Sequence, residues 1–223
     1  MRLSCTGNEL PNIPTINCTD TVGQLDNFCK LIKVNDQVLL YEQPNRAYYW
    51  VSLQADEIQL VVCHLEKYAE QAAKRGDWCG RLSDYLIVGM NTEDGDCYIL
   101  IVELRHTLSK VEQAIDKFEQ LENSIEQVMS RLQTDVISSS LFEKACWQPD
   151  KYKIAGFVIA PAGVRSIPLK QRTRRIVKDN YKGIIKIMPH ERVKECKITW
   201  TELLNEIVPK CDPHRFKGHR KQP

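Results

Sequence analysis

Residues 83–108, SDYLIVGMNTEDGDCYILIVELRHTL, decide the fold. Two apolar runs rich in β-forming residues flank NTEDGD, whose Asp94 and Gly95 favour a tight reversal, so the stretch predicts an antiparallel hairpin. Each strand has one carboxylate at its polar margin, because Asp84 opens the first run and Glu103 closes the second. The start of one hairpin strand lies beside the end of the other, so we expect both carboxylates at the same edge of a sheet.

Helical and strand patterns surround this hairpin. Before it, residues 54–74 have apolar side chains at helical spacing and Gly76 ends the run, which predicts a helix. After it, an apolar stripe from Val111 to Leu132 predicts a long amphipathic helix, and residues 154–161 predict a buried strand. Strand, helix and strand in this order predict a right-handed crossover with parallel pairing of the two strands.

Smaller elements are expected on both sides. Residues 28–53 alternate β-forming residues with turn signals, which indicates two or three strands. Residues 168–181, PLKQRTRRIVKDNY, predict a basic helix with Pro168 in its first turn. Three further short elements are expected, namely strands at 183–188 and 195–200 and a helix at 201–208.

Together these patterns predict one α/β domain with a mixed β-sheet flanked by helices. We divide the chain into a β-rich N-terminal extension at residues 1–53, an α/β core at 54–208 and a basic C-terminal tail at 209–223. With 223 residues, of which 43% are hydrophobic, the chain is long enough to bury a core.

The sequence also bears on the compartment. No apolar run is long enough to span a bilayer, and the first residues lack the apolar core of a secretion signal. The nine cysteines include no C-x-x-C pair, which predicts reduced and mostly buried thiols. We therefore expect a soluble cytoplasmic protein without a membrane partner.

Charge is distributed unevenly along the chain. Residues 151–223 hold 18 Lys and Arg against six Asp and Glu, a net charge of +12, whereas residues 1–150 have a net charge of −10. Such a basic segment favours contact with a polyanion, most often nucleic acid. The alternative is a basic face that docks on an acidic protein surface, including the chain's own N-terminal part. The candidate phosphate contacts are Arg165, Lys170, Arg172, Arg174, Arg175 and Lys178.

The two carboxylates of the hairpin predict a metal site. Two carboxylates brought together repel each other unless a cation separates them, and hard oxygen ligands suit Mg²⁺ or Mn²⁺. Such an ion can polarise a phosphodiester and generate hydroxide at neutral pH, so Asp84 and Glu103 predict phosphodiesterase chemistry. The alternative is that both residues stand at strand ends at the surface and that Arg105 pairs with one of them.

The residues SD(84)YLIVG and YILIVE(103)LR(105), with the order of elements around them, resemble the PD-(D/E)xK nuclease-like superfamily over about residues 54–190. The resemblance implies a restriction-endonuclease-like core of helix, three strands, helix and strand. It also implies that Asp84 and Glu103 are metal ligands.

In that superfamily an acidic residue of the first helix and a polar residue of the crossover helix often complete the site. The resemblance therefore makes Glu66 or Glu70, and Gln113 or Gln120, further candidates, and spacing alone does not choose within either pair. We take Glu66 and Gln120 forward as site residues.

Arg105 departs from the motif, which has Lys two residues after the second carboxylate. Arg is always protonated and cannot share a proton with water, so this departure bears on catalysis more than on fold. The first hypothesis is a Mg²⁺- or Mn²⁺-dependent nuclease, with DNA favoured over RNA and defence against foreign DNA as a setting suggested by analogy. The alternative is a catalytically degenerate subunit of the same fold that binds nucleic acid or assembles into a larger nucleoprotein complex.

Overall fold

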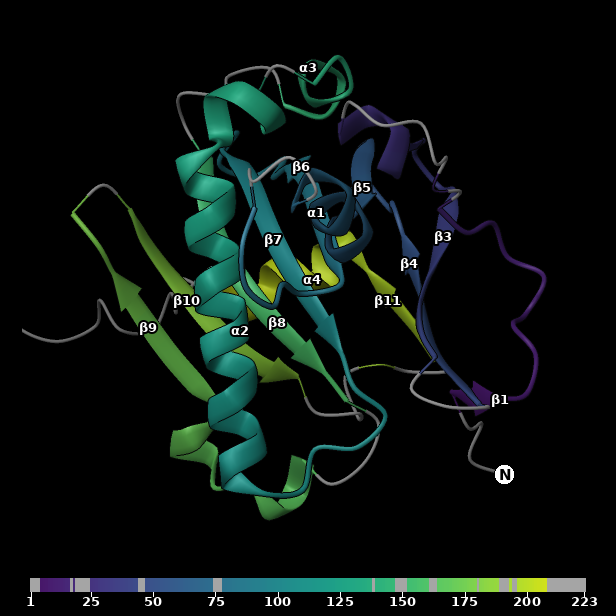
Figure 1. The fold of residues 1–223 in the computed structure, drawn as a ribbon. Helices are drawn as coiled ribbons and strands as arrows, with labels where there is room; N and C mark the ends of the chain where they lie inside the picture. Colours follow the sequence, from purple (N-terminus) through teal and green to yellow (C-terminus); the bar gives the residue numbers. More distant parts are fainter. Residues whose placement is uncertain are drawn as a thin grey trace, which may run out of the picture.

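The computed structural model describes residues 5–16, 18, 25–43, 47–73, 78–137, 139–146, 152–160, 164–179, 181–188, 193 and 196–207. The predicted tail at 209–223 therefore lies outside the described residues. The described residues form two β-sheets with helices packed against them (Figure 1).

A central sheet of seven strands has the order β2-β5-β6-β7-β8-β10-β9. β7 pairs in parallel with β8, and β8 with β10, whereas the other neighbours pair antiparallel. The predicted α/β class, the β6–β7 hairpin and the parallel partner after the long helix are thus confirmed. The strands are β2 (Cys29–Ile32), β5 (Leu60–His64), β6 (Tyr85–Met90), β7 (Cys97–Leu104), β8 (Tyr152–Ile159), β9 (Thr173–Val177) and β10 (Lys182–Met188).

A smaller sheet is built around β4, which pairs with three other strands. Its members are β1 (Thr6–Gly7), β3 (Gln37–Glu42), β4 (Tyr48–Gln54) and β11 (Lys197–Thr199). The strands expected within residues 28–53 are present, but they belong to both sheets, because β2 pairs with β5 of the central sheet.

Helices cover the central sheet on both faces. α1 (Leu65–Ala73), α2 (Val111–Ser130) and the short α3 (Phe142–Ala145) pack on one face, and α4 (Trp200–Ile207) packs with the smaller sheet on the other (Figure 1). Single turns complete the described elements: η1 (Leu25–Phe28), η2 (Leu132–Val136), η3 (Val164–Ser166) and η4 (Leu169–Gln171).

β7 separates two apolar cores. All eight of its residues are buried, as expected of a strand that is covered on both faces. Ile99 and Ile101 join the core under α2, whereas Leu100 and Val102 join the core under the smaller sheet. The same alternation directs Glu103 to the α2 face.

The helix predicted at residues 54–74 is wrong in its first half. Residues 60–64 form β5, and the helix begins only at Leu65. Val61 and Val62 are β-branched, pair with β6 and face opposite cores, so strand pairing overrides the helical spacing. Two strands, β6 and β7, lie between α1 and α2, as the sequence patterns predict, whereas the core implied by the resemblance has three strands between its two helices.

The basic helix predicted at residues 168–181 is also wrong. Thr173–Val177 form β9, which pairs with β10 at the end of the described central sheet. Within this strand Ile176 is buried while Arg175 and Val177 are exposed, the alternation of a half-buried strand. Positive charge on an edge strand opposes pairing with another chain.

The prediction of reduced cysteines is wrong for six of the nine. Three disulfides join Cys5 to Cys196, Cys29 to Cys63 and Cys97 to Cys146. Disulfides are typical of oxidising compartments, so the cysteines no longer support the expected cytoplasmic location. Among the helices of the described residues, none is long and apolar enough to cross a membrane.

Candidate functional site

Asp84 and Glu103 meet across the hairpin. Tyr85 pairs with Val102 in the β6–β7 ladder, and the next pair in this register is Asp84 with Glu103. Asp84 lies two positions before Leu86, and Glu103 lies two positions after Ile101. Leu86 and Ile101 face α2, so the two carboxylates point to that same face of the sheet. The prediction that they share one edge is confirmed.

A pocket of about 420 Å³ lies at this edge. It is lined by Tyr41, Glu42, Gln43, His64, Glu66, Lys67, Arg81, Asp84, Glu103, Arg105 and Gln120. The five predicted catalytic residues, Asp84, Glu103, Arg105, Glu66 and Gln120, are therefore together in one pocket. The two alternatives fall elsewhere, since Glu70 lines an adjoining pocket and the Gln113 side chain accepts hydrogen bonds from the Ser109 and Lys110 backbone at the start of α2.

Glu103 is buried and fully engaged, with 1% of its surface exposed. Its Oε1 accepts a hydrogen bond from Lys117 Nζ at 2.9 Å and lies 3.2 Å from the Arg105 guanidinium, and its Oε2 accepts from Gln120 Nε2 at 2.9 Å. The alternative that both carboxylates stand at the surface is wrong, although the pairing of Arg105 with one of them is present.

Carboxylates crowd this pocket. Asp84 is also buried, and its Oδ2 accepts a hydrogen bond from the Leu104 backbone N–H at 2.7 Å. Burial first, and the Glu103 carboxylate second, raise the pKa of Asp84 well above its usual value. Burial likewise raises the pKa of Glu42, Glu66 and Glu103. Burial is thus the main cause of the raised pKa of all four acids, and the cationic side chains of Lys67, Arg81 and Arg105 line the same pocket.

Lys117 is a site residue that the sequence interpretation missed. Its side chain is 5% exposed, and its Nζ donates to Glu103 Oε1 and, at 2.6 Å, to Gln120 Oε1. Burial lowers the pKa of Lys117, although the Glu103 carboxylate acts in the opposite direction. A signal existed in the sequence, because Lys117 lies three residues after Ala114 and four before Leu121, on the apolar stripe of α2.

Arg105 joins the two sheets. Besides its ion pair with Glu103, its guanidinium donates to Glu42 Oε1 of β3 at 2.7 Å. Glu42 was missed because it is 63 residues from Arg105 and comes from the other sheet. The side chain at the motif position is thus held between two carboxylates.

His64, at the end of β5, is also part of the pocket. The residue is 6% exposed, and the centroid of its ring lies 4.8 Å from that of the Tyr85 ring. Burial lowers the pKa of His64 to about 4, so the ring is neutral at pH 7. No local sequence pattern marked it, because the helix predicted at 54–74 placed it on the wrong kind of element.

The chemistry of these side chains fits a divalent cation. Glu42 Oε2 and His64 Nδ1 are buried and have no hydrogen-bond partner within the described part of the chain. Such atoms are costly unless a partner satisfies them. Among the described residues, however, no three His, Cys, Asp or Glu side chains are already arranged as metal ligands.

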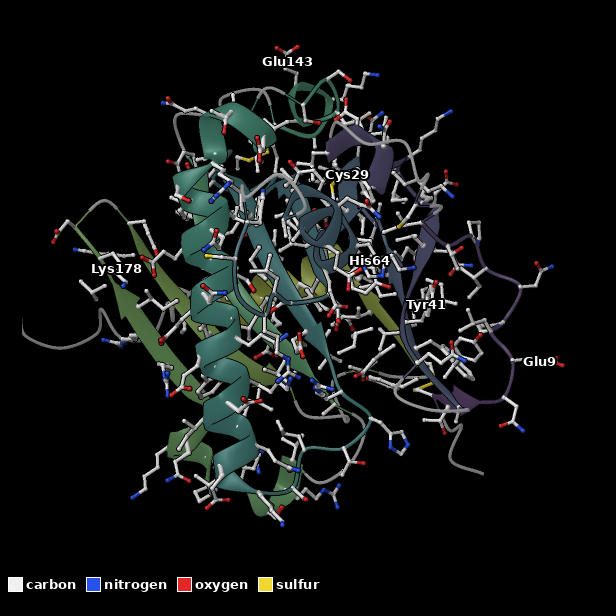
Figure 2. The ribbon with its side chains drawn as sticks, in the orientation of Figure 1. Glu9, Cys29, Tyr41, His64, Glu143 and Lys178 are labelled. Carbon is white, nitrogen blue, oxygen red and sulfur yellow. A yellow bond between two sulfur atoms is a disulfide. The ribbon has the colours of Figure 1, made fainter. Side chains whose placement is uncertain are left out.

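The six residues predicted to contact phosphate all belong to the described part of the chain, and none of them lines the pocket. Arg174 pairs with Glu122 at 3.1 Å and Lys178 with Glu126 at 3.7 Å, both on α2. Figure 2 shows Lys178 on the opposite side of α2 from His64 and Tyr41. Part of the basic segment therefore docks on the chain's own acidic part. Arg165, Lys170, Arg172 and Arg175 lie on η3, η4 and β9 or between them.

Comparison with known proteins adds no family. No protein-family model, no curated protein and no solved structure matches the chain. The resemblance to the PD-(D/E)xK superfamily remains a prediction from the residues of the hairpin.

Proposed function

We propose that the chain is a metal-dependent phosphodiesterase that acts on nucleic acid. The observation that carries this proposal is the convergence of Asp84, Glu103, Glu66 and Gln120 on one pocket with a buried lysine, Lys117. Carboxylate oxygens are the ligands that hold Mg²⁺ in proteins, and a metal ion held in this way can assist phosphodiester hydrolysis.

Asp84 and Glu103 would hold the cation, with Glu42 or Glu66 as a further ligand. A bound Mg²⁺ or Mn²⁺ supplies polarisation of the phosphodiester and hydroxide at neutral pH. Lys67 and Arg81, which line the same pocket, would contact the phosphate oxygens.

In this proposal Lys117 takes the role that the motif gives to the lysine two residues after the second carboxylate. Its Nζ contacts Glu103 Oε1, as an amine at the motif position would, but it reaches that carboxylate from α2. An amine whose pKa is lowered by burial can give up a proton, which the Arg105 guanidinium cannot do. Lys117 therefore orients the attacking water, while Arg105 fixes Glu103 and Glu42 relative to each other.

The test is cleavage of labelled single-stranded and duplex DNA and RNA with Mg²⁺ or Mn²⁺. We expect Asp84→Asn, Glu103→Gln and Lys117→Met each to reduce the rate by about 100-fold or more, because each removes a group that acts in the chemical step. Glu112→Gln, at an exposed position of α2, is the matched control and should cleave like the wild type. Cleavage that survives Glu103→Gln refutes this assignment of the site.

A second function, nucleic-acid binding without cleavage, is favoured by one observation. Both oxygens of Glu103 are already occupied by Lys117, Gln120 and Arg105, as in a structural ion-pair network. Binding of DNA or RNA by a wild-type protein that never cleaves, with no heat of Mn²⁺ binding by calorimetry, would establish this function in place of the first.

A further inference from the structure

A second pocket adjoins the candidate site. It has a volume of about 240 Å³ and lies between α1 and residues 78–82. Glu66 and Arg81 line both pockets, so the two cavities meet at these side chains.

One wall of this second pocket is held firmly by α2. Asn123 Nδ2 donates to the backbone oxygens of Arg81 at 3.1 Å and Cys79 at 3.5 Å, and Gln127 contacts the Cys79 sulfur. Gly80 has a φ of +75°, and a Cβ there would lie 3.0 Å from Asn123 Nδ2, so glycine lets the segment approach the helix. The wall is therefore preformed, as ligand pockets usually are.

The lining of the second pocket suits a nucleobase. Its apolar lining residues are Ala69, Ala73, Trp78 and Leu82. The exposed carboxylate in it is Glu70, which accepts hydrogen bonds and donates none when ionised. A small pocket with apolar lining residues and an acceptor at Glu70 matches a small ring that has an amino group.

We propose that this pocket binds the base next to the cleaved phosphodiester and selects a base with an exocyclic amino group, which donates to Glu70. The assignment rests on the proposed function, because it takes the neighbouring site to be where the phosphodiester is cleaved. Cytosine and uracil differ in this respect at one ring position, where cytosine has an amino donor and uracil a carbonyl oxygen. The Glu70 carboxylate attracts the first and repels the second.

A phosphate group is a poorer occupant for the same pocket. Glu66 and Glu70 both line it, and either carboxylate repels a phosphate. The cation among the residues that line it is Arg81, which is shared with the candidate site and pairs with Asp116 of α2 at 3.3 Å. Arg81 is thus placed to contact the phosphate between the two pockets, with the base beyond it.

The experiment compares the affinities of labelled oligo(dC) and oligo(dU) of equal length by fluorescence anisotropy, with Ca²⁺ in place of Mg²⁺. We expect the wild type to bind oligo(dC) about tenfold more tightly, a ratio that one base contact can supply. Ala73→Phe fills the pocket from an exposed position, and Glu70→Gln provides an amide that can donate to uracil, so both should bring the ratio close to one. Ile115→Phe and Glu119→Gln, exposed on α2, are the matched controls and should keep the ratio.

The outcomes separate the two proposals. Equal affinity of the wild type for both oligonucleotides, or a preference that survives Ala73→Phe and Glu70→Gln, overturns the base pocket and leaves the cleavage test of the proposed function unaffected. No binding of either oligonucleotide together with no cleavage overturns both. Circular dichroism of each variant shows that a lost preference does not come from unfolding.

Discussion

Lys117→Met should destabilise the protein by about 3 kcal/mol, although methionine suits the buried face of a helix. Removing one partner of a buried ion pair typically costs about 3–5 kcal/mol, because the other charge stays buried without compensation. The cost should be at the low end of this range, since Glu103 keeps its hydrogen bond from Gln120 and its ion pair with Arg105. The loss also removes the 2.6 Å hydrogen bond between Lys117 and Gln120.

The assay is urea unfolding at pH 7, followed by circular dichroism, with EDTA present so that no metal contributes. Glu103→Gln alone should also destabilise, because it leaves the Lys117 ammonium buried beside an amide. The double variant should be more stable than the sum of the two single effects predicts, by about 1–3 kcal/mol, because no unpaired charge remains. Lys144→Met, exposed on α3, is the matched control and should change the free energy of unfolding by less than about 0.5 kcal/mol.

Two results would refute this reasoning. A loss below about 1 kcal/mol in Lys117→Met would mean that the lysine is solvated and not buried against Glu103. Single effects that add within about 0.5 kcal/mol in the double variant would mean that the two side chains do not interact. Either result would also remove the support that Lys117 gives to the proposed chemistry.

Three further predictions concern regions away from this pair. Cys5→Ser should lower the free energy of unfolding by about 5 kcal/mol through loop entropy, because the disulfide to Cys196 spans 191 positions. Equal Tm values for the wild type and Cys5→Ser would contradict this prediction. Gly89→Ala should lower the free energy of unfolding by about 1–3 kcal/mol, because the new Cβ would lie 2.5 Å from Leu60 and 3.0 Å from Trp200. An unchanged midpoint of urea unfolding would show that the core has room for this Cβ. Burial acts to raise the pKa of Asp94, but hydrogen bonds from Asp96 N–H, Lys153 and Tyr98 outweigh burial, and the pKa is lowered. The ionised Asp94 carboxylate therefore stabilises the fold above its unfolded pKa, and this stabilisation is lost as the pH falls below about 4. Asp94→Asn should cost about 0.5–1 kcal/mol at pH 7 and nothing near pH 2, and a pH-independent difference contradicts the assignment.

The hairpin and its two carboxylates could be predicted because the information is local. A turn signal, two apolar runs and strand alternation fix which residues face each other. The helix predicted over residues 54–74 failed where the apolar run was short, since a run of that length fits either a strand or a helix until its partners are known. The basic helix failed for the same reason at residues 173–177, where β10 supplies the partner.

The missed site residues have different causes. Lys117 could have been predicted from the sequence, because burying the charge of a lysine on the apolar stripe of a helix is costly unless a partner pairs with it. The role of Glu42 in the pocket could not have been predicted from the sequence, since its contact with Arg105 depends on how the two sheets pack. The three disulfides were not readable either, because spacing alone does not determine which cysteines pair.

Arg105 and Lys117 have to be considered together. Glu103 and Arg105 have the same parity on the strand, so a side chain two residues after the carboxylate emerges on the α2 face beside it. At that point β3 presents Glu42, and the guanidinium lies 2.7 Å from the Glu42 carboxylate and 3.2 Å from that of Glu103. A guanidinium suits such a bridge because its planar fork can serve two carboxylates at once. The ammonium that contacts Glu103 more closely comes from α2, one layer away. Under the proposed function, an arginine at position 105 does not by itself leave the site without an amine, because Lys117 of the neighbouring helix contacts the same carboxylate.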